Sequence, residues 1–310
     1  MASPPPAPTV LRAVSLDFDD TLIESEAMKR AALIGIISLA GLLSLWLLLA
    51  WLGKTESNYR QPRPGMRFES KGDKASAPET IVVYQPRHFA DGEVGHYQVR
   101  MEKGFLKMPA GKVTFAAQQI DHNGTTAWQF TLKGGALGGL VQYDARSIVN
   151  AQFTHSLEYH TVQKDLASRN VVLQFDPQQK SCRRQLNGNP DGVVDTEPST
   201  FDPLSIIFKF RELDLARPGE FDSAVCDGKA TFQSKVTVVG REEIQIGDKN
   251  YKTILVEPDL GQLRGVFQKD PDAKLQIWLS DDSHRAVLRI RTKVKHGTFI
   301  ADLADYQRPE

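Results

Sequence analysis

Hydrophobic positions along the chain follow two patterns, one continuous and one alternating. The continuous pattern is residues 31–53, an apolar run that contains no charged residue. A helix needs roughly 20 such residues to cross the hydrocarbon core of a bilayer. Lys29 and Arg30 precede the run, and Trp46 and Trp51 lie toward its far end, where an aromatic belt is expected. The pattern predicts one transmembrane helix.

The apolar run is better suited to an uncleaved signal anchor than to a cleaved signal peptide. It is longer than the ~7–15 residues of a signal h-region, and its small residues Ala50 and Gly53 have Leu48 and Trp51 at the −3 position, which makes both poor cleavage sites. More basic residues follow the run than precede it, but long domains cross a membrane largely regardless of charge. We therefore expect the N-terminus inside and the large domain outside. Residues 1–30 are either a short tail or sequence that is not translated.

After the apolar run the chain is polar up to residue 80 and then alternates. Residues 54–80 lack the apolar content needed to form a packed core and predict a flexible linker. Residues 81–310 predict a mainly β domain in which short turns join antiparallel neighbours, as an up-and-down barrel or cradle. Asn123-Gly124 is typical of a hairpin turn. Strands are expected at 112–120, 125–132, 155–163, 170–175, 230–245, 250–257, 275–279, 286–294 and 298–303.

One segment of this domain has the pattern of a helix. Asp202 is a favourable N-cap residue and Pro203 a favourable first helical residue. Leu204 to Arg211 then carry apolar side chains on more than one face. The pattern predicts a short helix that is buried on two sides, as it would be at one end of a barrel.

Composition narrows the classes of function. The chain has 310 residues, with 38 basic and 38 acidic side chains, so its net charge is zero. This balance gives no support to nucleic acid as a partner. Two cysteines exclude a disulfide-rich scaffold and a four-cysteine zinc site.

A possible catalytic motif lies before the apolar run. Residues 14–22, VSLDFDDTL, resemble the first motif of the haloacid dehalogenase superfamily, in which Asp17 would be the nucleophile and Asp19 the general acid. That fold needs further strands and helices, but the chain enters the predicted span soon after Thr21. We therefore interpret the motif as a decoy, and a hydrolase remains only the alternative function.

Other candidate sites are weak, and we expect no metal and no cofactor. Residues 187–195 resemble a calcium loop, but Pro198 occupies the twelfth position, where a bidentate glutamate is required. A cluster of turns is the preferred interpretation. His155 and His160 would face opposite sides of a strand. Residues 134–139 lack the Lys-Ser/Thr of a phosphate loop and predict a flexible loop.

Two blocks of residues resemble the bacterial "domain of unknown function 3108" family. The first comprises Asp202-Pro203-Leu204-Ser205, Arg211, Leu213, Gly219 and Asp227-Gly228-Lys229. The second comprises Ile277-Trp278-Leu279-Ser280-Asp281-Asp282, Arg285, Gly297 and Leu303. The resemblance implies an exported, all-β domain associated with the envelope of Gram-negative-type bacteria, and it supplies no catalytic residues.

Together these features predict a single-pass inner-membrane protein with a large periplasmic domain. We expect a non-catalytic binding or structural module of the envelope, which holds an apolar ligand in one form and docks a protein in another. Its partners would be the membrane, through one helix, and a lipid or envelope protein. Cys182 and Cys226 would then lie in an oxidising compartment, either paired as a disulfide or buried as free thiols.

Overall fold

The computed structural model describes most of the predicted β domain. All of the described residues belong to one compact unit, Leu39–Glu310. The predicted span 31–53, the linker 54–80 and the motif at Asp17 and Asp19 lie outside them. Within the part described, no helix has both the length and the apolar character needed to cross a membrane. The described residues are 87–136, 141–164, 168–259, 273–294 and 297–309.

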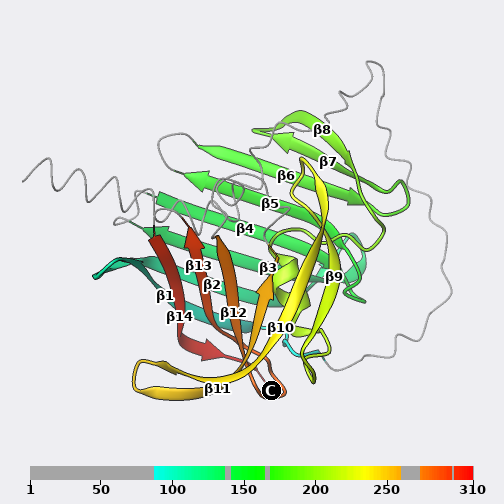
Figure 1. The fold of residues 1–310 in the computed structure, drawn as a ribbon. Helices are drawn as coiled ribbons and strands as arrows, with labels where there is room; N and C mark the ends of the chain where they lie inside the picture. Colours follow the sequence, from blue (N-terminus) through cyan, green and yellow to red (C-terminus); the bar gives the residue numbers. More distant parts are fainter. Residues whose placement is uncertain (1–86, 137–140, 165–167, 260–272, 295–296, 310) are drawn as a thin grey trace, which may run out of the picture. The chain divides into compact units, whose positions relative to one another are not determined.

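These residues form one antiparallel sheet of 14 strands and one short helix, α2 (Ser205–Arg211) (Figure 1). The predicted mainly β class and its single short helix are therefore confirmed. The strands are β1 (Glu93–Lys103), β2 (Leu106–His122), β3 (Thr125–Ala136), β4 (Val141–Asn150), β5 (Ser156–Lys164), β6 (Arg169–Asp176), β7 (Ser181–Leu186), β8 (Asn189–Asp195), β9 (Gly219–Cys226), β10 (Thr231–Ile246), β11 (Lys249–Pro258), β12 (Lys274–Ser280), β13 (Val287–Val294) and β14 (Gly297–Gln307).

The order of the strands is that of an up-and-down barrel with one opening. Strands β1 to β8 form one meander, β9 to β14 form another, and β1 pairs with β14 between them. The two edges of the sheet are thus β8 and β9, and the connection between them carries α2. Short contacts lie near these edges: Phe201 of the connection forms an isolated parallel bridge with Val225 of β9, and Thr231 Oγ1 of β10 donates to the Asp195 carbonyl oxygen of β8 at 2.7 Å.

Local sequence explains the turns that set the register. The β2–β3 turn places Asn123 at φ 55° and Gly124 at φ 81°, conformations that these residues tolerate, and His122 then pairs with Thr125. The turn of Asn187 and Gly188 has the same character, with φ 51° and 81°.

Two local interpretations were wrong. The calcium-like segment 187–195 is not a cluster of turns, because only its first two residues turn and the rest form β8. Gly134 and Gly135 are not in a loop, because they extend β3, where they pair with Tyr143 and Gln142 of β4. In both cases pairing with a neighbouring strand supplies order that the local sequence does not.

The helix packs on a cluster of aromatic side chains. The Phe208 ring lies 4.1 Å from Phe130 and 5.8 Å from Phe89, and Phe89 is also 5.1 Å from Phe153 (centroid to centroid). All four side chains are buried. Each contributes roughly 1.5–3 kcal/mol by leaving water, which is why a helix of two turns is stable here. Ile206 and Phe210 are buried as well, so the predicted burial of more than one face is confirmed.

Candidate functional site

A buried carboxylate holds the start of α2. Asp202 Oδ2 accepts hydrogen bonds from the hydroxyls of Ser147, Ser156 and Ser205, at 2.5, 2.5 and 2.7 Å. Its Oδ1 accepts the backbone N–H groups of Leu204 and Ser205, at 2.8 and 3.0 Å. Asp202 thus caps the helix, although the regular helix begins at Ser205. We call these four side chains the Asp202 cluster.

The Asp202 cluster is suited to holding the helix rather than to catalysis. Asp202 and the three serines are each 0% exposed, so a substrate cannot reach them. The serine hydroxyls donate to a carboxylate and have no imidazole base beside them among these contacts, unlike an activated serine nucleophile. The cluster therefore links β4 and β5 to the first turn of α2.

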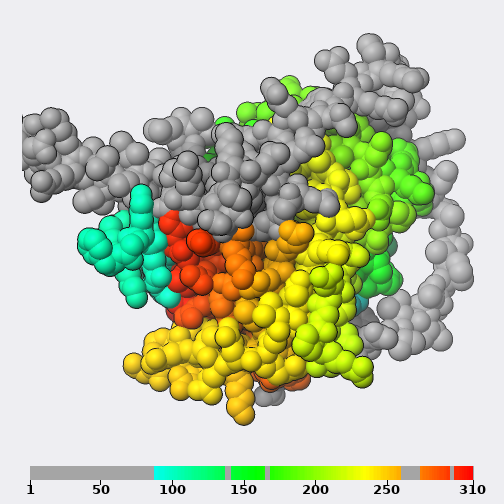
Figure 2. Space-filling view, in the orientation of Figure 1, coloured from blue at the N-terminus to red at the C-terminus, as the bar shows by residue number. Residues whose placement is uncertain are grey.

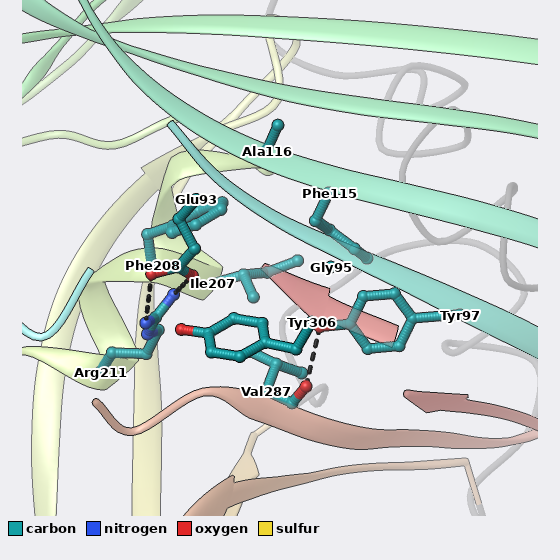
Figure 3. Close-up of a pocket in the computed structure, with 10 residues that line it drawn as sticks. All are labelled: Glu93, Gly95, Tyr97, Phe115, Ala116, Ile207, Phe208, Arg211, Val287 and Tyr306. Atoms are coloured by element: carbon teal, nitrogen blue, oxygen red, sulfur yellow. Dashed lines mark hydrogen bonds and ion pairs between the residues drawn. The ribbon is translucent and has the colours of Figure 1, made fainter. Parts of the chain in front are cut away.

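A buried ion pair holds the end of the helix. Arg211 is 1% exposed, and Nη1 and Nη2 donate to Glu93 Oε1 and Oε2 of β1 at 2.5 and 3.1 Å (Figure 3). Nη2 also donates to the carbonyl oxygens of His88 and His284, at 2.6 and 2.8 Å. Burial alone would lower the pKa of Arg211, but Glu93 outweighs it and the net change in pKa is upward. Arg211 therefore stays charged, and the pair ties α2 to β1.

The turn between β12 and β13 closes over the same end of α2. Asp282 Oδ1 accepts the Ser280 hydroxyl at 2.8 Å and the N–H groups of His284 and Arg285 at 2.8 and 3.0 Å, which fixes the turn. Arg285, at φ 46°, then donates through Nη1 to the carbonyl oxygens of Arg211 and Leu213, at 2.8 and 2.6 Å. A cation at the last carbonyls of a helix satisfies acceptors that the helix cannot.

A small cavity lies beside the Glu93–Arg211 pair. Tyr97, Phe115, Phe208 and Tyr306 also contribute to its walls (Figure 3). Its volume is about 10 Å³, which is room for about one water molecule.

The two tyrosines of this cavity are held in the neutral form. Burial, and then the Glu93 carboxylate, raises the pKa of Tyr306 to about 12. Burial likewise raises the pKa of Tyr97, whose hydroxyl donates to the Val287 carbonyl oxygen at 2.7 Å. Neither hydroxyl is therefore suited to act as a base near neutral pH.

The second notable site is where the turn after β9 packs against β6 and β7. Cys182 of β7 and Cys226 of β9 are thiols, both 0% exposed, and Cys226 raises the pKa of the Cys182 thiol. Gly228, at φ 85°, lies so close to Leu173 that a Cβ atom there would be 2.3 Å from Leu173 Cδ2. A Cβ would also be 2.9 Å from Arg184 Cδ. We call these five residues the seam.

An ionisable group lies beside the seam. Asp227 Oδ1 accepts the N–H groups of Lys229 and Ala230 at 2.7 and 2.8 Å, which shapes the turn that carries Gly228. Burial raises the pKa of Asp227 to about 6, even though these bonds and the charge of Arg184 act in the opposite direction. Arg184 also forms an ion pair with Asp191.

The structure brings most of the singled-out residues into these sites. Cys182 and Cys226 meet, and the first block of family-like residues supplies the helix cap, Arg211 and the Asp227-Gly228 turn. The histidines stay apart: His160 bonds Asn170 and His155 bonds Thr154. No group of three or more potential metal ligands occurs among the residues that the structure describes.

Sequence reasoning missed the partners of these residues, namely Glu93, Ser147, Ser156 and Arg184. A signal for Glu93 was present, because alternate residues 93, 95, 97, 99 and 101 form the buried face of β1. An acidic residue in that series needs a buried cation.

The fold and its sites define a class: an all-β domain built around a clamped helix. The family model described as "Protein of unknown function (DUF3108)" matches residues 96–304, and the chain belongs to this family. A search of curated proteins gives no match. A solved structure that resembles the fold is a "Beta-barrel-like Protein of Domain of Unknown Function DUF1849 from Brucella abortus", with 8% identity and a TM-score of 0.46, over 72% of this chain and 99% of that chain.

Proposed function

We propose that this protein is a non-catalytic module of the bacterial cell envelope. Residues 31–53 anchor it in the inner membrane, residues 54–80 form a tether, and residues 81–310 form the domain in the periplasm. Its role is to hold a rigid β domain within reach of the bilayer, at a distance that the length of the tether limits. As a flexible coil, the tether has a root-mean-square reach of roughly 30 Å.

The observation that carries this proposal is that the family-like polar residues make structural contacts within the domain. Asp202 caps α2, Arg211 pairs with Glu93, and Asp282 shapes the turn that places Arg285 on the helix end. Each acts on another part of the protein rather than facing a space that a substrate could occupy. The residues by which this chain resembles its family therefore hold the fold together, which is typical of a scaffold rather than of an enzyme.

The cavity beside Arg211 is too small for an enclosed apolar ligand. With a volume of about 10 Å³ it cannot hold an acyl chain, since ligand pockets are roughly 300–1,000 Å³. The tip of the β1–β2 hairpin is a more suitable contact. Phe105 is 101% and Leu106 44% exposed, and Lys103 and Lys107 flank them.

This tip projects at the edge of the molecule, in teal in Figure 2. An aromatic ring and an aliphatic side chain between lysines suit the surface of a bilayer that contains anionic lipids. We therefore propose that the tip is the point at which the domain touches the membrane. In this proposal the lipid partner binds at the surface of the domain.

Two measurements on the full chain test the proposal. A reporter that is active only outside the cytoplasm is fused after Glu310, and the membrane fraction is extracted at alkaline pH. We expect an active reporter and retention in the membrane, with release when residues 31–53 are deleted. An inactive reporter on an intact product would refute the periplasmic placement.

The rival hydrolase function has its own test. Purified full chain is assayed for magnesium-dependent phosphatase activity together with an Asp17→Asn variant. We expect no turnover from either protein. Turnover that the substitution abolishes would establish the alternative function and overturn the scaffold.

A further inference from the structure

The seam joins β7 and β9, two strands that are not neighbours in the sheet. Cys182 belongs to the meander β1–β8, and Cys226 ends β9, the other edge of the sheet. Cys182 pairs along the ladder with Phe175 and Val194, and Cys226 pairs with Thr231, so neither is a strand partner of the other. Their meeting is a feature of tertiary packing.

The packing around the cysteines fixes their approach. The Gly228 N–H donates to Cys226 Sγ at 3.3 Å, and the Cys226 N–H donates to the Phe201 carbonyl oxygen at 2.9 Å. Gly228 leaves no room for a Cβ against Leu173, which sets how closely the turn approaches β6. Both side chains are wholly buried, and Gly228, two residues after Cys226, packs against Arg184, which is two residues after Cys182 on β7.

We infer that Cys182 and Cys226 form a disulfide bond that locks the β9 edge of the sheet onto β7. The bond would close a loop that contains β8 and α2. It would also tie the start of β7 to the end of β9. Its occurrence in cells rests on the proposed periplasmic location, because a disulfide persists in an oxidising compartment.

The reaction is a pair of thiol–disulfide exchanges with a disulfide donor. The thiolate of one cysteine attacks the donor, which forms a mixed disulfide and releases one donor thiol. The second cysteine then displaces the other donor thiol and forms the Cys182–Cys226 bond. Two protein thiols are oxidised and one donor disulfide is reduced to two thiols, with the protons passing to the donor thiols.

The exchange must precede closure of the seam. Both sulfur atoms are 0% exposed in the folded protein, so a donor cannot reach them. In addition, the hydrogen bond with Cys226 and then burial raise the pKa of the Cys182 thiol well above its ordinary value, which leaves little thiolate. The donor in cells is therefore an oxidoreductase that acts on the unfolded, newly exported chain.

The first experiment determines whether the bond can form. Full-length protein in detergent is reduced, unfolded and then refolded with reduced and oxidised glutathione. It is next unfolded in the presence of an alkylating reagent, and its mass is measured by mass spectrometry. We expect an unalkylated chain that is lighter than the reduced chain by the mass of two hydrogen atoms. Two alkylated thiols would overturn the inference.

Thermal unfolding supplies a second readout. In the chain-entropy description of a loop of about 40 residues, the oxidised protein should unfold roughly 10 °C above the reduced protein. The matched control is the double variant Cys182→Ala/Cys226→Ala, in which reductant should change nothing. An equal midpoint for oxidised and reduced wild-type protein would remove the proposed lock.

The second experiment separates the bond from the location. Cells that make the full chain are quenched in acid and alkylated without reductant, and the oxidised fraction is measured. Full oxidation supports both proposals. If the chain is reduced in cells but forms the bond on refolding, the disulfide stands and the periplasmic location fails.

Discussion

Removing the guanidinium of Arg211 should strongly destabilise the domain. Arg211→Leu deletes the two bonds to Glu93 and the two to the backbone carbonyl oxygens of His88 and His284. It leaves a carboxylate that is 5% exposed, without its cation, and that still accepts the Ala90 N–H at 3.2 Å. An unpaired buried charge of this kind costs about 3–5 kcal/mol. At about 2–4 °C per kcal/mol, the midpoint of thermal unfolding should fall by roughly 10 °C.

Urea unfolding of the full chain in detergent measures the change, with the slope checked for constancy. The control is Lys235→Met, which breaks an ion pair with Glu220 of similar length, 2.9 Å, on the exposed face of β9 and β10. That variant should unfold like wild type. In a double-mutant cycle, Glu93→Leu should cost less in the Arg211→Leu background than alone, by about 0.5–3 kcal/mol. Equal effects of Arg211→Leu and Lys235→Met, or strict additivity in the cycle, would refute the reasoning.

Three further predictions address the seam and the hairpin tip. Gly228→Ala should destabilise the domain by about 1–3 kcal/mol more than Gly188→Ala in urea unfolding, because both have φ above 80° but only Gly228 lacks space for a Cβ; equal losses would contradict this. Asp227 has its folded-state pKa raised to about 6 from 3.8, so the folded state binds the extra proton and the free energy of unfolding should fall by about 2 kcal/mol as pH rises from 4 to 7. Asp227→Asn keeps an oxygen acceptor for the turn and should abolish this dependence of the free energy of unfolding on pH. An unchanged pH dependence would mean that another group causes it. Phe105→Ser should weaken protection of the hairpin tip from protease when the full chain is reconstituted in vesicles with anionic lipid. Val239→Ser, at another exposed apolar residue, on β10, should not; equal protection of wild type and both variants would argue against the membrane contact.

Alternation and turn residues were sufficient to predict about two thirds of the strands. The hairpin at Asn123-Gly124 and the helix after Asp202 were recognisable because their geometry depends on nearby residues. Five strands were missed, namely β1, β4, β7, β8 and β9, although β1 and β4 do alternate between buried and more exposed positions. In β8, Pro190 and Gly192 obscure the pattern, and pairing with β7 supplies the order.

The sites were harder to predict than the strands because their partners are distant in sequence. Arg211 was singled out, but Glu93 lies 118 residues before it. The meeting of Cys182 and Cys226 could be proposed from their small number, yet the packing of Gly228 on Leu173 depends on the wrapping of the sheet. Pairings of this kind depend on topology, which local propensity does not specify.

The pairing of β1 with β14 has a consequence for biosynthesis. The first strand of the domain finds one of its two neighbours only when the last strand, Gly297–Gln307, has been made. Until then the N-terminal meander has an open edge of unpaired backbone groups, which other chains can join. A ribosome that stops before Gly297 should therefore release an aggregating product rather than a smaller stable domain. The newly made chain needs protection along this edge for the whole time that it takes to synthesise and export the domain.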